Sequence, residues 1–304
     1  MRTIVVGGAN MLKNNKLMLW CQRKYEQSSA EHCGRDCDNK AHCNHDCDDC
    51  LKQVHWYPEY GGRSDYTCSN LLLRYVVRFT EKYSQQIHGA LDFVDISQYP
   101  YFSILSIGCG AAPDLMAFEE IAEDKAIYYK GYDRNPLWRP VHDKIEAYAE
   151  TTANITANLQ RKDIFDVLFR GRLANKRFNV IVIQYLLSHL YNTGQERQTR
   201  TLFQGIIDNI ISNRLHNSPF LIIITDIDSY NKGRNRWYSF LDMLEDAGYY
   251  GDAYARSAFP TGDLGAERWS DYHHKQSPSY QNISYTYVQN ESDHDGAQLV
   301  IELR

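Results

Sequence analysis

The sequence predicts an α/β fold: a mostly parallel sheet with helices on both faces and an antiparallel C-terminal strand pair, preceded by a small, irregular Cys-rich module. Three observations support this prediction. After residue 70, short apolar runs alternate with helical patterns, which is typical of a parallel sheet covered on both faces. The last two apolar runs have no helical pattern between them, so we expect them to pair antiparallel at an edge. All but one of the 8 cysteines precede residue 70.

Length and composition are those of an ordinary globular protein. The chain has 304 residues, of which 43% are hydrophobic and 23% charged, enough for a large core. No apolar run reaches the ~18 residues that a membrane-spanning helix needs. The N-terminal MRTIVVGGANML is too short and too glycine-interrupted for a secretory signal. We therefore expect a cytoplasmic protein without a membrane partner, in which thiols stay reduced.

Two parts are expected, a Cys-rich module over 1–70 and a main domain over 71–304. Within the module, residues 2–8 and 16–21 have the pattern of two short strands around a turn. Segment 31–50 holds six acidic residues against two basic ones, while the whole chain has a formal net charge of −5. Because this acidity repels phosphates, a protein surface is the better partner for the module.

The main domain has the pattern of alternating helices and strands. Its first helix is expected over 70–87, where Leu72, Val76, Phe79 and Tyr83 fall on one face. Further helices are expected over 114–123, 141–159, 199–214 and 237–248. Strands are expected over 102–108, 126–133, in or just before 160–168, and over 177–185, 219–228, 283–289 and 297–304.

A candidate ligand site begins where the first strand ends. In SILSIGCGAAPD the strand runs into Gly108-Cys109-Gly110, and a helix follows. Glycines at such a turn let the backbone approach a ligand closely, beside the N-terminal amides of the helix. Asp133 ends the second strand, where a carboxylate can accept hydrogen bonds from both hydroxyls of a ribose. A dinucleotide fingerprint needs a third glycine where this chain has Pro113, so the pattern favours a smaller adenosyl ligand.

From Leu71 to Arg304 the chain resembles the class I S-adenosylmethionine-dependent methyltransferases, which have a Rossmann-like fold. LSIGCGAAPD is similar to the family's first motif, and GYD to the acidic end of its second strand. RKDIFD is similar to the segment after its third strand, and NVIVIQYLLSHL to its fourth strand and exit. The final strand pair is similar to the family's reversed seventh strand. The resemblance implies S-adenosyl-L-methionine as the cofactor and methyl transfer as the activity.

The resemblance also implies a set of cofactor-binding residues. The glycine loop would surround the methionine part of the cofactor, and Asp133 would bind the ribose. Asp163 would face the adenine, with Ile164 packed beside it, and Gln184 and Tyr185 would line the methyl-transfer pocket. The expected cofactor-binding residues are Gly108, Cys109, Gly110, Asp114, Asp133, Arg134, Asp163, Ile164 and Gln184.

The catalytic candidates are His189, Tyr185 and Asp226. Methyl transfer from a sulfonium is an in-line displacement, which needs proximity and at most a base. His189 follows Gln184 by five residues and is the first candidate for that base, although a packing role on a helix fits it as well. Asp226 ends the fifth strand at the same rim, where it either orients a substrate amine or caps a helix.

The acceptor is expected to be a nitrogen or oxygen of a macromolecule, either protein or RNA. The motif for amino-group attack on adenine or cytosine is missing, because Gln184-Tyr185-Leu186-Leu187 follows the fourth strand. A cysteine nucleophile is not expected, since Cys109 lies inside the glycine loop. The alternatives are a small-molecule acceptor and a non-catalytic protein that serves assembly.

A local basic loop is the one feature of the main domain that favours nucleic acid. Lys232, Arg234 and Arg236 precede Trp237, and alternating cations beside an aromatic ring suit phosphates and bases. The simpler interpretation is a solvated loop with Trp237 packed into the next helix, so a nucleic-acid partner is left open.

The module's cysteines predict a metal site. The candidate ligands are Cys21, Cys33, Cys37, Cys43, Cys47 and Cys50, of which the last four are preferred. Zinc takes four such ligands in a tetrahedron, and binding it would order a segment too acidic to fold by itself. The Cys43-x3-Cys47-x2-Cys50 spacing also matches a radical-SAM cluster, although it lies outside any barrel strand. An iron–sulfur cluster and disulfides stay as alternatives.

Overall fold

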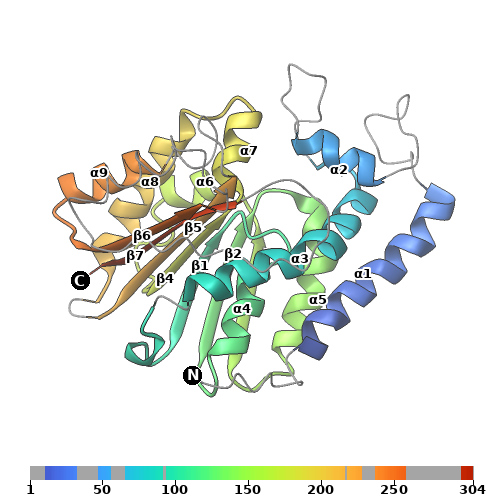
Figure 1. Ribbon diagram of the computed structural model, residues 1–304, viewed down its shortest axis with the longest axis horizontal. Coiled ribbons are helices and arrows are strands. Elements are labelled where there is room, and N and C mark those ends of the chain that lie inside the picture. The colour runs from blue at the N-terminus through green and yellow to red at the C-terminus, as the bar shows by residue number, and fades with distance from the viewer. Residues whose placement is uncertain are drawn as a thin grey trace.

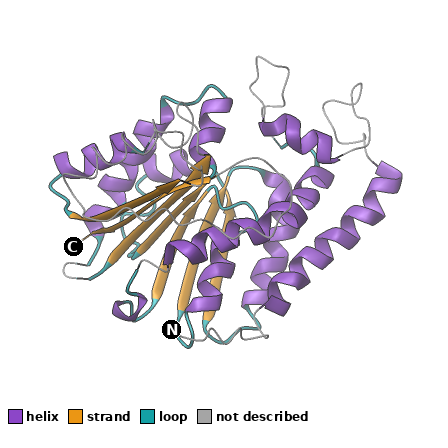
Figure 2. Cartoon of the chain, in the orientation of Figure 1, coloured by secondary structure: helices purple, strands orange, loops and turns teal. Residues whose placement is uncertain are grey.

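A seven-stranded sheet lies between two layers of helices (Figures 1 and 2). The computed structural model describes residues 11–32, 47–55, 66–91, 94–215, 218–227, 237–257 and 296–303. The strands are β1 (Phe102–Ile107), β2 (Ile127–Asp133), β3 (Ile155–Arg161), β4 (Val180–Gln184), β5 (Phe220–Ile227), β6 (Gly251–Ser257) and β7 (Gly296–Leu303). Their order across the sheet is β3-β2-β1-β4-β5-β7-β6.

Strands β3, β2, β1, β4 and β5 are parallel, and β7 runs antiparallel between β5 and β6. This confirms the predicted mostly parallel sheet with an antiparallel C-terminal pair. The predicted partner of the last strand, over 283–289, lies outside the described residues. The strand that pairs with β7 is β6, which the sequence analysis missed because Gly251–Ser257 contains no apolar run.

The helices divide into two layers, one on each face of the sheet (Figure 1). The helices of the described part are α1 (Met11–His32), α2 (Cys47–His55), α3 (Ser69–Leu91), α4 (Pro113–Ile121), α5 (Arg139–Ala149), α6 (Ile164–Phe169), α7 (Leu186–Asn192), α8 (Gln198–Asn209) and α9 (Tyr238–Asp246). Helices α1, α3, α4 and α5 share one hydrophobic core with the sheet, and α6 to α9 share a second. The central strands β1, β4 and β5 are mostly apolar because both of their faces are buried.

The predicted helix over 141–159 was wrong in its second half. Helix α5 ends at Ala149, and β3 begins at Ile155. In β3, Ile155 and Leu159 are buried while Thr156 and Asn158 are exposed. Apolar residues spaced by four fit both a helical face and a strand, so the pattern alone was ambiguous.

The irregular structure predicted for the N-terminal module was also wrong in its described ranges, which form α1 and α2. Residues 16–21 are helical, not a strand, whereas residues 2–8 lie outside the described ranges. Leu17 and Cys21 are spaced by four and pack against Leu72 and Val76 of α3. None of the described helices is long and apolar enough to cross a membrane.

Candidate functional site

A crevice lies at the carboxyl ends of β1, β2 and β4. The strand order reverses between β1 and β4, and ligands of open parallel sheets bind at such a point. A cavity of about 130 Å³ occupies it. Its walls bring together most of the residues predicted from the sequence: Gly108, Gly110, Asp133, Arg134, Asp163, Ile164, Gln184, Tyr185 and His189.

The glycine loop is held in a left-handed backbone conformation. Gly108 has φ 68° and Gly110 has φ 48°, values that cost other residues about 1–2 kcal/mol. The amides of Gly108 and Cys109 both donate to the carbonyl oxygen of Tyr132, at 2.8 and 3.0 Å. The loop is thus fixed against the end of β2, with its glycines facing the cavity.

Asp133 lies where β2 ends, and its carboxylate faces the loop. Oδ2 accepts from the Gly110 amide at 3.1 Å, and Oδ1 accepts from the Asn135 amide at 2.9 Å. Each oxygen has further lone pairs. Across the crevice, Asp163 caps α6 by accepting from the Phe165 amide at 2.8 Å, and it also lines the cavity.

A second, smaller cavity of about 20 Å³ lies behind the loop, lined by Thr80, Gly108, Gly110 and Asp114 among others. Asp114 is buried, which raises the pKa of its carboxyl to about 6. Its Oδ1 accepts from the Tyr129 hydroxyl at 2.9 Å. Within the described residues, its Oδ2 and the Thr80 hydroxyl have no hydrogen-bond partner. Buried polar atoms of this kind suit a polar ligand group such as an ammonium.

His142 and Trp138 are two residues of the site that the sequence analysis missed. His142 Nε2 lies 2.8 Å from the Gly110 carbonyl oxygen. Burial lowers the pKa of His142 to about 4, so the neutral ring donates its Nε2 proton to the loop at neutral pH. The Trp138 ring stacks on His142, with centroids 6.1 Å apart. Nothing in the stretch PLWRPVH distinguishes these residues from an ordinary helix start.

The other end of the crevice has a wall of tyrosines. Tyr83 stacks on Tyr185 with ring centroids 4.2 Å apart, and Tyr75 contacts Tyr83 at 6.1 Å. Tyr66 stacks on His189 at 6.3 Å. Tyr83 was predicted to lie on the buried face of a helix, and the helical period contained no signal that this face also lines a cavity.

Tyr185 adopts a backbone conformation that is uncommon for a residue other than glycine, with φ 53°. Its amide donates to the Thr225 carbonyl oxygen at 2.7 Å, and its hydroxyl lies 2.8 Å from Gln86 Nε2. The Gln86 carbonyl in turn accepts from Gln298 at 2.9 Å. Strained residues that neighbouring contacts hold in place are concentrated at functional sites.

Asp226 is buried, and its position favours helix capping over a substrate contact. Its Oδ2 accepts from the amides of Leu187 at 2.8 Å and Ser188 at 3.1 Å, at the start of α7. Burial raises the pKa of this carboxyl to about 6. Asp226 is not among the cavity-lining residues, whereas its neighbour Ile227 is.

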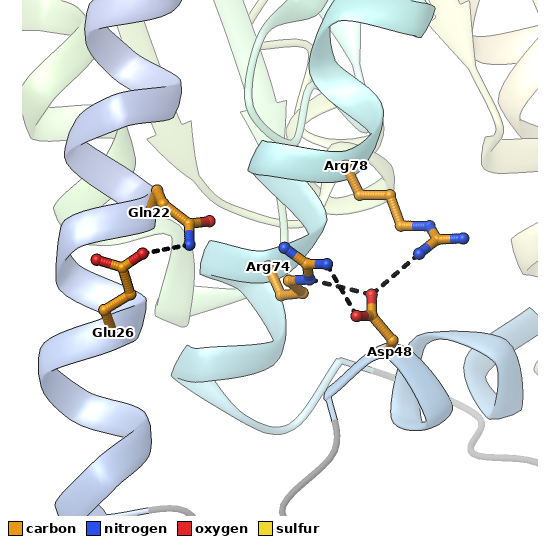
Figure 3. Close-up of polar contacts among 5 residues, drawn as sticks. All are labelled: Gln22, Glu26, Asp48, Arg74 and Arg78. Carbon is orange, nitrogen blue, oxygen red and sulfur yellow. Dashed lines mark hydrogen bonds and ion pairs between the residues drawn. The ribbon is translucent and has the colours of Figure 1, made fainter. Parts of the chain in front are cut away.

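Helix α2 lies against α3, and an ion-pair clamp joins the two helices (Figure 3). Asp48 accepts from Arg74 Nε and Nη2 at 3.0 and 2.8 Å, and from Arg78 Nη1 at 3.1 Å. Cys47 and Val54 pack in one apolar cluster with Tyr83. Val54 also lines the cavity, so the cysteine-containing segment contributes to the wall.

The predicted metal ligands fall into two groups. Cys33, Cys37 and Cys43 lie outside the described residues, as does the basic loop 232–236. The described ones are Cys21, Cys47 and Cys50; Cys21 is buried on α1 in the core shared with α3, and burial raises the pKa of its thiol to about 12. The described ranges contain no group of three or more potential metal ligands, and their cysteines form no disulfide with one another.

Comparisons with known proteins give structural neighbours only. No protein-family profile and no curated protein sequence matches the chain. The plantazolicin methyltransferase BpumL in complex with SAH is 14% identical, with 98% of this chain and 100% of that chain covered and a TM-score of 0.45. A SAM-dependent methyltransferase from Archaeoglobus fulgidus is 14% identical, with 74% of this chain and 97% of that chain covered and a TM-score of 0.39. The cyclase SpnF is 13% identical, with 72% of this chain and 80% of that chain covered and a TM-score of 0.40. At this degree of similarity, the function has to be inferred from the crevice itself.

Proposed function

We propose that the chain is an S-adenosylmethionine-dependent methyltransferase that acts on a nitrogen or oxygen of a macromolecule, either protein or RNA. The observation that supports it is the convergence of three elements on one crevice. These are the left-handed glycine loop after β1, the Asp133 carboxylate at the end of β2, and His189 after β4.

The residues present fit the cofactor. Asp133 lies in the cavity wall where its carboxylate would accept from the ribose hydroxyls, and Asp163 with Ile164 lies where the adenine would bind. Asp114 Oδ2 and the Thr80 hydroxyl, unpartnered within the described residues, suit the methionine ammonium. The cavity of about 130 Å³ is smaller than the ~300 Å³ of the smaller ligand sites, so rings such as those of Tyr66 and Trp138 must move aside on binding.

The bound cofactor supplies a methyl group activated by a positive sulfonium. The chain's own residues hold the two reactants in line and exclude water from between them. The tyrosine wall stabilises positive charge through its ring faces. His189 accepts the proton that the acceptor nitrogen or oxygen loses.

A small-molecule acceptor is the second candidate, because the crevice is narrow and its far end is lined by aromatic rings. The two candidates are separated by incubating the full chain with tritiated S-adenosylmethionine and cell extract, then treating the products with nuclease or protease. The proposal expects label in a nuclease- or protease-sensitive fraction, and Asp133→Ala should abolish it. Label in the small-molecule fraction alone supports the second candidate. Absence of any label favours a non-catalytic assembly protein.

A zinc site in the Cys-rich segment, and a cytoplasmic location, stay part of the proposal. Cys37, Cys43, Cys47 and Cys50 are the preferred ligands, and the buried thiol of Cys21 is left out. Metal analysis by mass spectrometry on protein purified without chelator tests the site. About one equivalent of zinc supports the zinc site, whereas iron together with sulfide would assign an iron–sulfur cluster to this segment.

A further inference from the structure

One face of the sheet is open to solvent where β2 meets β3. Parallel pairing places Tyr128 beside Thr156, and Lys130 beside Asn158, so these side chains lie on the same face. Tyr128 is 52% exposed, and Thr156 and Asn158 are exposed as well. A central strand normally buries such a ring, which makes an aromatic and polar face at this position a feature to explain.

Cations surround this face. Lys130 lies over the Tyr132 ring, 5.7 Å from its centroid. Burial lowers the pKa of Lys130, and the nearby positive charges of Lys176 and Lys162 lower it further. Burial raises the pKa of Tyr132, and the positive charge of Arg172 opposes that rise. All of these cations therefore lie near the face.

The positive charge of this face is not neutralised by ion pairs among the residues that the structure describes. Within the described part of the chain, Lys130, Lys162, Arg172 and Lys176 form no ion pair. Of the two acids in segment 162–176, Asp163 is already engaged as the cap of α6. The face is thus locally positive on a chain whose formal net charge is −5.

We propose that this β2–β3 face, made by Tyr128, Lys130, Asn158, Lys162, Arg172 and Lys176, binds single-stranded nucleic acid. Phosphates pair with the cations, a base stacks on Tyr128, and the Asn158 amide reaches a base edge. A duplex is excluded as the occupant because its bases are already stacked and paired. Lys162 also lines the crevice, so the face leads to the candidate site.

The inference rests on the proposed function only in making the bound strand a substrate; binding itself needs no methyl transfer. The test titrates the full chain into fluorescein-labelled dT20 or rU20 and measures binding by the fluorescence anisotropy of the oligonucleotide. We expect a dissociation constant on the order of 10⁻⁶ to 10⁻⁴ M at low salt, and weaker binding as salt rises. Lys130→Glu/Lys176→Glu should weaken binding at least tenfold, and Tyr128→Ala about tenfold.

The matched control is Lys24→Glu/Lys144→Glu, which makes the same change in net charge on α1 and α5, in the other helix layer. It should bind within twofold of the native chain. The proposal is overturned by no binding at 50 mM salt, or by equal losses in test and control variants. It is also overturned if sedimentation shows a dimer that Tyr128→Ala dissociates, since the face then joins two copies.

Calorimetry with S-adenosylhomocysteine on the same variants separates the two proposals. Retained cofactor affinity with lost oligonucleotide binding supports the β2–β3 face as a distinct site. If the native chain binds the oligonucleotide but no cofactor, the result supports the β2–β3 face as a nucleic-acid site and contradicts the proposed function.

Discussion

The two ends of the crevice are built in different ways. The end that we propose for the cofactor, called the cofactor end, consists of the loop between β1 and α4 and the last residue of β2. Backbone hydrogen bonds to Tyr132 hold the loop. The tyrosine end is assembled from distant segments: Tyr75 and Tyr83 lie on α3, whereas Tyr185 and His189 follow β4. α2 covers it.

Because the two ends present different chemical groups, the affinity for the cofactor and the rate of methyl transfer should be separable. The cofactor end presents glycine backbone and carboxylates, so its substitutions should change cofactor affinity. The tyrosine end presents rings and one imidazole, so its substitutions should change the rate of transfer. The following predictions test that separation.

The largest effect is expected at His189. His189→Asn should lower the methyl-transfer rate by about 10²- to 10⁴-fold, the usual contribution of a positioned base. The affinity for S-adenosylhomocysteine should stay within threefold. Single-turnover kinetics and calorimetry measure the two quantities. His88→Asn, on the last turn of α3, is the matched control and should change neither; an unchanged rate in His189→Asn would return that residue to a packing role.

The next effect is expected at the glycine loop. Gly110→Ala places a methyl group inside the crevice, 3.5 Å from Trp138, and should weaken S-adenosylhomocysteine binding about 10- to 200-fold. Gly194 also has positive φ, at 69°, but an added Cβ there meets nothing within 4 Å. Gly194→Ala therefore carries the same backbone strain without the steric effect. Equal affinities for the two variants would contradict the assignment of the loop.

His142 should make the cofactor end sensitive to acid. Its pKa falls from 6.5 to about 4 on folding, so between these values the unfolded chain binds a proton that the native chain does not. The native state therefore loses stability as pH falls from 6.5 towards 4. His142→Gln should lack this loss, giving a shift of about 1–2 kcal/mol between pH 7 and pH 5 relative to the native chain. Urea denaturation of both chains at both pH values measures this shift. If the stability difference between the native chain and His142→Gln is the same at pH 7 and pH 5, His142 is not a buried, neutral imidazole.

The smallest effect is expected at the clamp that holds α2. Asp48→Asn removes a charge that two arginines share, and should lower the free energy of unfolding by about 1 kcal/mol, since the side chains are partly exposed. High salt should reduce the difference. Asp246→Asn on α9, an exposed carboxylate, is the control for urea denaturation. If Asp48→Asn loses no more unfolding free energy than Asp246→Asn, apolar packing alone holds α2 against α3.

The two ends also differ in how far the sequence predicted them. Gly108, Gly110 and Asp133 follow one another along the chain at strand ends, so their convergence follows from parallel topology alone. Tyr66 and Tyr75 reach the crevice, and His142 reaches the glycine loop, only through the docking of α3, the residues just before it, and α5. No local pattern encodes that docking. β6 was missed because it is held by its ladder with β7 and not by an apolar run.

The central claim is that the glycine loop and the Asp133 carboxylate together hold an adenosyl ligand. Titration calorimetry with S-adenosylhomocysteine tests it on the native chain, on Asp133→Ala and on Asp124→Ala, whose carboxylate lies in an exposed turn. We predict binding by the native chain and by Asp124→Ala. We predict a loss of at least about 100-fold in Asp133→Ala, because two hydrogen bonds to a charged group are worth about 1.5–3 kcal/mol each. No binding by the native chain, or equal affinity in Asp133→Ala, would contradict the account.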